Sequence, residues 1–141
     1  MAKFDLIGLG NALVDSEFHV TDSFLKKKAF EKGTMHLVDS DEQTNLLNSL
    51  EKEYGKPSLA CGGSATNTIF AASILGSSCS YICKVGNDKN GNFYLDDLSD
   101  AGVNIDHSVM LDSNINSGTC TVMVSPDAER TMSTCLGISS D

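Results

Sequence analysis

The chain has 141 residues and a mass of 15.0 kDa, which suits one domain or part of one. Its formal net charge of −9 and pI near 4.6 argue against nucleic acid and anionic membranes as partners, because phosphate groups favour basic surfaces. No apolar run approaches the roughly 20 residues that a membrane helix needs. The start shows no signal-peptide pattern, and five cysteines cannot all pair within one chain. We therefore expect a cytoplasmic protein.

The first predicted strand covers residues 4–9 and ends in an apolar run, which is typical of a strand buried on both faces. A Gly-x-Gly sequence follows, but Leu13 replaces the third glycine of a dinucleotide-binding loop. Asn11 and Asp15 come just after this strand, where open α/β sheets bind their ligands. A carboxylate there can accept two hydrogen bonds from sugar hydroxyls, although capping of the local backbone is an equally common role.

The central motif of the chain is Gly62-Gly63, which leads into a helical pattern over residues 65–75. Ser64 is the predicted N-cap of this helix and Gly76 its stop. Glycine lets a ligand approach the backbone closely, and free N–H groups at a helix start favour anions and polar oxygens. Asn67 falls in the first turn, so its amide can face the same spot. A capped helix after a simple Gly-Gly turn is the alternative.

The other predicted elements are strands and helices separated by turns. They are strands at 17–20 and 34–38 joined by a polar loop, a helix at 40–54 opened by a Ser-x-x-Gln capping box, a strand at 78–85, a helix at 92–101, and strands at 109–112, 118–125 and 130–136. The last two strands form an antiparallel hairpin around a turn at 126–129. Cys79 and Cys83 are about 13 Å apart if they lie on one strand, which is too far to share a zinc ion, so no metal site is expected.

In combination these motifs resemble the PfkB family of sugar and nucleoside kinases. Residues 62–67, with Gly76 and Gly86 at their spacings, are similar to the first signature of that family. Further agreements follow in the family's order, at residues 10–15, 85–88 with Gly91, 97–98 with 101–103, and 118–120 before 127–132. Ile69 stands where the family prefers a small residue. The resemblance implies an α/β fold, namely the N-terminal half of a ribokinase-like three-layer α/β/α sheet. It also implies a small β lid formed by strands near 17–20, 34–38 and within 109–125.

The resemblance further implies an ATP-dependent kinase, with Mg²⁺, that phosphorylates a primary hydroxyl of a sugar or nucleoside. Asp15 would hold sugar hydroxyls, and Asn67 would complete the pocket with Gly62 and Gly63. Asn11 would lie beside the sugar or base. Met35 and Cys120 are further candidates for lining this cavity, although residues of both types are more often plain core residues. We expect Asp15 and Asn67 to converge on one sugar-sized hollow.

Arg130 matches a position near the transferred phosphate in several members of the family, where a guanidinium can stabilise developing charge. A surface ion pair with Glu129 or Asp127 is the alternative. The second signature of the family, a Gly-Ala-Gly-Asp helix start with the catalytic base and anion hole, has no counterpart in these 141 residues. We therefore expect a chain that lacks the ATP-binding half, binds no ATP or Mg²⁺, holds no further catalytic residue and is inactive alone.

The substrate and the partners can be narrowed further by the same resemblance. An adenosine-like nucleoside is favoured over a free sugar, because residues 118–120 and 127–132 are similar to those of nucleoside-type members. Sheet edges and apolar faces that the second half would cover predict a homo-oligomer, formed through the lid or an exposed sheet edge. The alternative to a kinase half is a non-catalytic α/β module that binds a small molecule or only self-associates.

Overall fold

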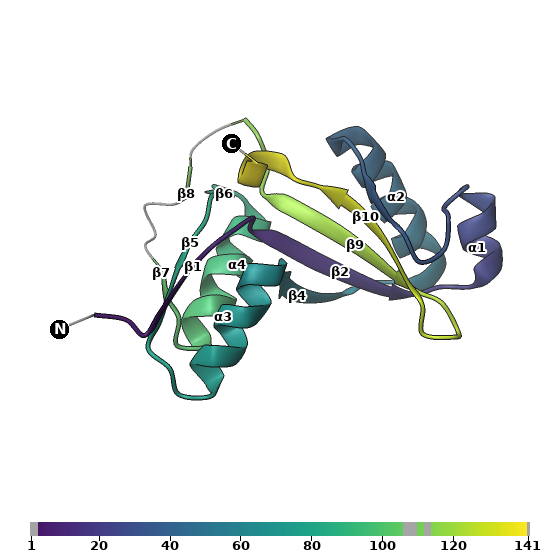
Figure 1. The fold of residues 1–141 in the computed structure, drawn as a ribbon. Coiled ribbons are helices and arrows are strands. Elements are labelled where there is room, and N and C mark those ends of the chain that lie inside the picture. Colours follow the sequence, from purple (N-terminus) through teal and green to yellow (C-terminus); the bar gives the residue numbers. More distant parts are fainter. Residues whose placement is uncertain (1–2, 106–109, 112–113, 141) are drawn as a thin grey trace. The chain divides into compact units, whose positions relative to one another are not determined.

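The computed structural model describes residues 3–105, 110–111 and 114–140 of the chain. Its elements run in the order β1 (Leu6–Leu9), β2 (Leu13–His19), α1 (Asp22–Lys27), β3 (Met35–Leu37), α2 (Ser40–Tyr54), β4 (Ser58–Gly62), α3 (Ser64–Ile74), β5 (Cys79–Ile82), β6 (Val85–Gly86), α4 (Lys89–Asp100), β7 (Asn104–Ile105), β8 (Met110–Leu111), β9 (Gly118–Val124), β10 (Arg130–Cys135) and a 3₁₀ helix at Gly137–Ser140 (Figure 1).

The chain divides into two compact units, which we describe separately. Unit 1 comprises Met1–Val14, Ala60–Gly118 and Leu136–Asp141, and unit 2 comprises Asp15–Leu59 and Thr119–Cys135. Each unit has its own cluster of buried apolar side chains. In the described part of the chain, no helix is both long enough and apolar enough to cross a bilayer.

Unit 1 contains a parallel sheet in the order β1-β5-β7, with α3 and α4 packed on one face. Tyr81 of β5, Ile69 of α3 and Leu98 of α4 are buried together on this face. The other face of the sheet carries Ile7 and Leu9, which are 64% and 74% exposed. The prediction that β1 is buried on both faces is therefore wrong for the described residues, because the two helices of unit 1 cover the same side.

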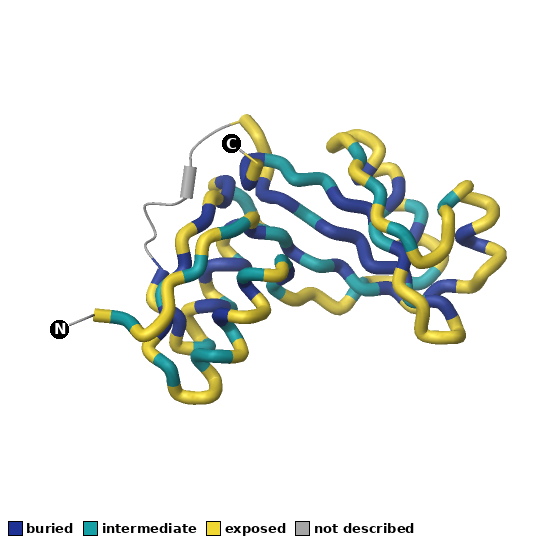
Figure 2. The backbone as a smooth tube through the Cα atoms, in the orientation of Figure 1, coloured by how far each residue is buried: buried dark blue, intermediate teal, exposed yellow. Residues whose placement is uncertain are grey.

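Unit 2 is built on strands of a second sheet, which has the order β3-β10-β9-β2-β4. Strands β9 and β10 pair antiparallel, as the predicted hairpin requires, and β3 pairs parallel to β10. Helices α1 and α2 cover one face, where Phe24 and Leu50 pack with Phe18 of β2 and Met123 of β9. Five of the seven residues of β9 and three of the six residues of β10 are buried, and Figure 2 shows their course.

The start of α2 differs from the predicted capping box. Asp39, not Ser40, is the N-cap, and its carboxylate accepts a hydrogen bond from the Glu42 N–H at 2.8 Å. Gln43, which the prediction placed in the box, instead turns inward and is 3% exposed. Its side-chain amide donates to the Thr121 hydroxyl at 3.0 Å and accepts from the Ser133 hydroxyl at 3.0 Å. This polar contact fastens α2 to the sheet.

Two further helices start at other residues than predicted. The N-cap of α3 is Gly63, with Ser64 as the first helical residue, so no side chain caps this helix. Helix α4 begins at Lys89, three residues before the predicted start, because Asp88 caps it by accepting a hydrogen bond from the Gly91 N–H. In both cases an extended or glycine-only backbone conformation just before the helix decides where it begins.

Several other elements were missed or misplaced. Helix α1 lies in the predicted polar loop; it is too short to show a helical period, but Thr21 caps it and Phe24 and Leu25 are buried. Strand β2 begins at Leu13 rather than at residue 17, and β4 was not predicted. The predicted strand at 78–85 consists of two separate strands, β5 and β6. Of the strand predicted at 109–112, only residues 110–111 lie among the described ones, as β8.

Candidate functional site

The Gly62-Gly63 turn joins β4 to α3 in unit 1. Gly63 has φ +101° and ψ +136°, a conformation that side chains rarely adopt. A Cβ at this position would lie 2.7 Å from the backbone oxygen of Asn11. Glycine is therefore required twice, once by the backbone angle and once by the close approach of the chain at Asn11.

The start of α3 presents backbone N–H groups that no side chain caps. Asn67 lies in the first turn, where its own N–H donates to the Gly63 oxygen at 2.9 Å and its side chain is exposed. Asn11 is also exposed and follows β1 after Gly10. Within unit 1 the structure therefore brings together four of the predicted residues, Asn11, Gly62, Gly63 and Asn67. The backbone at Asn11 approaches Gly63, and the Asn67 N–H bonds the Gly63 oxygen, so the turn lies between two residues with exposed amide side chains. Amide side chains and the N–H groups of a helix start suit a ligand with hydroxyl or phosphate oxygens.

A buried group of hydroxyls lies next to this turn. Thr66 of α3 donates to the hydroxyl of Tyr81 at 2.9 Å, and its oxygen is 2.5 Å from the hydroxyl of Tyr94. The Tyr94 hydroxyl also donates to the Gly62 oxygen at 3.4 Å. Burial raises the pKa of both tyrosines, so both hydroxyls stay protonated at neutral pH. We call these three residues the hydroxyl cluster.

The other predicted residues lie on the sheet of unit 2, on the face opposite α1 and α2. The strand register aligns Met35 with Met132 and Val122, and Leu37 with Thr134 and Cys120. Side chains alternate between the two faces of a strand. Thr121 and Met123 of β9 face α2, so Cys120 and Val122 face the other way. Met35 is aligned with Val122 through Met132 and therefore lies on the same far face. On β2, Phe18 packs with the helices, and Asp15 lies three residues before it. Residues three apart on a strand point to opposite faces, so Asp15 is on the far face too.

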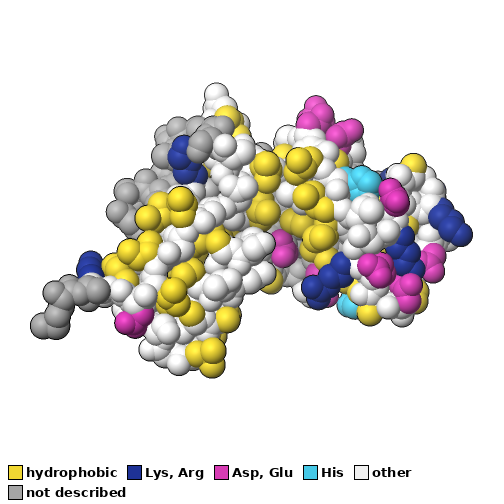
Figure 3. Space-filling view, viewed as in Figure 1, with side chains coloured by type: hydrophobic (Ala, Val, Ile, Leu, Met, Phe, Trp, Pro, Cys, Tyr) yellow, Lys and Arg dark blue, Asp and Glu magenta, His cyan; other side chains and the backbone are white. Residues whose placement is uncertain are grey.

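This face carries the charged groups Asp15, Glu17 and Arg130. Burial raises the pKa of Asp15 from 3.8 to about 6; Arg130 opposes the rise and Glu17 adds to it. No ion pair of Arg130 occurs among the residues that the structure describes, and the Asp127 carboxylate is bound by Lys32 instead. Figure 3 shows hydrophobic side chains gathered over β2 and β9 in this unit. The face therefore combines an apolar surface with a partly buried carboxylate and a cation.

Cys120 and Met35 differ in exposure. Cys120 is 5% exposed, and the Thr134 hydroxyl donates to its sulfur at 3.3 Å. Burial raises the pKa of the Cys120 thiol, so it stays protonated and unreactive at neutral pH. Met35 is 54% exposed on the edge strand β3. Both side chains can contribute apolar surface to a ligand, and neither offers a nucleophile.

Lys32 anchors the hairpin that carries Arg130. Its ammonium lies 2.8 Å from Asp22 at the start of α1 and 2.6 Å from Asp127 in the β9–β10 turn. The hydrogen bond from Lys32 lowers the pKa of Asp127 to about 2. Asp127 in turn accepts from the Ser125 hydroxyl at 2.8 Å, which fixes the turn from within. Arg130 itself is held by strand pairing with Val124, beside a turn that this exposed ion network braces.

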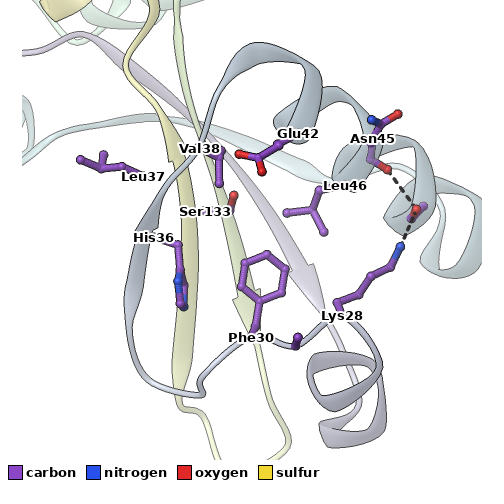
Figure 4. Close-up of a pocket in the computed structure, with 11 residues that line it drawn as sticks. Lys28, Phe30, His36, Leu37, Val38, Glu42, Asn45, Leu46 and Ser133 are labelled. Carbon is purple, nitrogen blue, oxygen red and sulfur yellow. Dashed lines mark hydrogen bonds between the residues drawn. The ribbon is translucent and has the colours of Figure 1, made fainter.

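A cavity of about 470 Å³ lies on the helix side of the unit 2 sheet (Figure 4). Asp15 lies on the opposite face of this sheet, as the alternation along β2 requires. Phe30, Val38 and Leu46 form its apolar walls. Its two charged side chains already have partners in the chain: Lys28 donates to Ser49 at 2.9 Å, and Glu42 completes the cap of α2. We therefore assign no ligand to this cavity.

The sequence pattern of the pfkB family of carbohydrate kinases matches residues 33–141. The chain belongs to this family. Adenosine kinase 2 of Arabidopsis thaliana is 30% identical over 122 residues, which cover 84% of this chain and 34% of that relative. The chain thus spans about a third of the length of this curated relative and corresponds to its N-terminal portion.

Comparison with solved structures also finds kinases that share this fold. The adenosine kinase of Sinorhizobium meliloti has a TM-score of 0.87 and 34% identity, covering 99% of this chain and 41% of that one. A probable sugar kinase of Rhizobium etli has a TM-score of 0.85 and 31% identity, with coverages of 99% and 41%. The predicted α/β, ribokinase-like fold is confirmed, and this pfkB chain represents its N-terminal part.

Proposed function

We propose that the chain carries the sugar-binding half of an ATP-dependent kinase that phosphorylates a primary hydroxyl of an adenosine-like nucleoside. The observation that carries this proposal is the Gly62-Gly63 turn, which opens α3 without a side-chain cap and leaves room for no Cβ at Gly63. The similarity to the adenosine kinases of Arabidopsis thaliana and Sinorhizobium meliloti supports a nucleoside as the substrate. The similarity to a probable sugar kinase of Rhizobium etli keeps a free sugar as the second candidate.

The roles of the site residues follow from their chemistry. Asp15 accepts two sugar hydroxyls when ionised, and Asn67 and the first N–H groups of α3 bind the same sugar. Asn11 lies beside the sugar or base. Met35 and Cys120 supply apolar contacts from the sheet of unit 2, which serves as the lid. Arg130 stabilises charge on the transferred phosphoryl group.

ATP and Mg²⁺ belong, in this proposal, to the part of the longer relatives that the chain does not match. Among the described residues, no group of three or more His, Cys, Asp or Glu side chains is arranged to hold a metal ion. The chain contributes substrate binding, and phosphoryl transfer also needs groups that position ATP. The 141 residues alone are therefore proposed to bind a nucleoside and to be inactive.

Calorimetric titration of the purified chain with adenosine, ribose and fructose tests this function. We expect adenosine to bind more tightly than either sugar, with a dissociation constant in the range of roughly 0.1 to 1 mM, because only half of the site is present. Incubation with adenosine and Mg-ATP should give no AMP above a protein-free control. Absence of adenosine binding at 5 mM total ligand (about five times the upper expected value) would refute the binding role, and AMP formation would refute the predicted inactivity.

Self-association is the expected behaviour of the purified chain. The sheet face of unit 1 exposes Ile7, Leu9 and Ile82, the last by 51%, and β1 is an edge strand of that sheet. We propose that two copies cover these apolar faces. Light scattering across a hundredfold dilution should show a dimer that dissociates on dilution, and Leu9→Lys should weaken it at least tenfold. Leu75→Lys, which alters an 86% exposed side chain at the end of α3, is the matched control. A monomer at all concentrations would contradict the proposal.

A further inference from the structure

The hydroxyl cluster joins three elements of unit 1 at one side-chain oxygen. Thr66 comes from α3, Tyr81 from β5 and Tyr94 from α4, and their exposed fractions are 0%, 2% and 0%. Valine and phenylalanine would fill the same volume without bringing hydroxyls into an apolar core, where each must find a partner. Fully satisfied polar clusters of this kind restrict a core to one arrangement.

The cluster also contacts both glycine corners of the candidate site. A Cβ at Gly63 would lie 3.3 Å from the Thr66 hydroxyl, and a Cβ at Gly10 would lie 2.9 Å from the Tyr81 hydroxyl. The turn before α3 and the segment that leads to Asn11 therefore pass so close to these hydroxyls that a Cβ at either glycine would press on one of them. Tyr94 adds the contact with the Gly62 oxygen at 3.4 Å.

We propose that Thr66 is a positioning residue whose hydroxyl, through Tyr81 and Tyr94, holds the two glycine corners in the arrangement that binds the nucleoside sugar. This inference rests on the proposed function. Thr66 itself is buried and does not touch the ligand. It acts on Asn67, the next residue of α3, and on the Gly62-Gly63 turn, because a fixed corner presents its amides to the sugar at no further ordering cost.

Thr66→Val tests this role because it keeps the shape of the side chain and removes its hydroxyl. We expect adenosine affinity to fall at least tenfold. Hydrogen exchange at the Asn67 amide, which is bonded to Gly63, should rise at least tenfold. The Val103 amide, bonded to Leu98 in the same unit, should keep its exchange rate. Thr66→Ser, which retains the hydroxyl, should restore both properties.

Thr68→Val is the matched control, because Thr68 lies two residues further along α3 and is exposed. Among the described residues, its hydroxyl donates only to the Ser64 oxygen. It should behave as the unaltered chain. The proposal is overturned if Thr66→Val changes neither property, or if Val103 exchange rises as much as Asn67 exchange, since the cluster would then support only the stability of the whole unit. If the unaltered chain binds no adenosine, the proposed function fails, and the exchange ratio of Asn67 to Val103 alone decides the positioning role.

Discussion

Gly63→Ala is expected to abolish nucleoside binding and to lower the free energy of unfolding by about 2–4 kcal/mol. The substitution forces a Cβ onto a residue with φ +101° and places it 2.7 Å from the backbone oxygen of Asn11. A backbone atom cannot move aside as a flexible side chain can, so the turn itself must shift. Urea denaturation and calorimetry with adenosine measure the two effects.

Gly76→Ala separates the clash from the backbone strain. Gly76 has φ +100°, nearly the same as Gly63, but a Cβ there would meet no atom within 4 Å. We expect this control to cost only about 1 kcal/mol and to leave binding unchanged. Equal losses of stability and binding in the two variants would show that the close approach at Asn11 has no role.

Asp15→Asn is expected to weaken adenosine binding at pH 8 by roughly 10- to 100-fold, because an ionised carboxylate accepts hydroxyl hydrogen bonds more strongly than an amide. The same substitution should raise the free energy of unfolding at pH 8 by about 1 kcal/mol. That figure is well below the full value of the pKa shift, because Asp15 is only partly buried. A gain in stability together with a loss of binding is typical of a residue kept for function.

The pH dependence of Asp15→Asn follows from the raised pKa. The folded chain holds the Asp15 proton up to about pH 6, whereas the unfolded chain releases it near 3.8. Stability from this residue is therefore complete below about pH 3.8 and is lost as the pH rises through about 6. The stability difference between variant and unaltered chain should grow between pH 4 and 7. A difference that stays constant over this range would contradict the raised pKa.

Much of the fold was predictable from local patterns. The helical spacing at 65–75 gave α3 to within one residue, and the turn at 126–129 correctly joined β9 to β10. Short elements were not predictable: α1 has six residues, fewer than two helical turns, so its buried Phe24 and Leu25 show no period. The cap of α2 was misplaced because Asp39 and Ser40 are both good N-caps, and only the backbone conformation distinguishes them.

The sequence allowed us to predict residues of the candidate site, but not the buried hydroxyl cluster that lies beneath them. Gly62, Gly63 and Asn67 were identifiable because glycines before a helix start have a direct chemical meaning. Tyr81 and Tyr94 were predicted only as members of a strand and a helix, because nothing local indicates that their hydroxyls meet at Thr66. The available signal was Thr66, a polar residue three positions before the apolar Ile69 and so on the same face of the predicted helix. The common face of Met35 and Cys120 required the strand register.

We propose that Asp15 and Asn67 bind the same sugar, and a nuclear magnetic resonance titration of the chain with adenosine tests this proposal. We expect the Asn67 side-chain amide and the backbone amides beside Asp15 to shift together, with one dissociation constant. We also expect Asp15→Asn to weaken the response at Asn67 by the same factor as the response in β2. Shifts at only one of the two residues, or two unrelated dissociation constants, would contradict it.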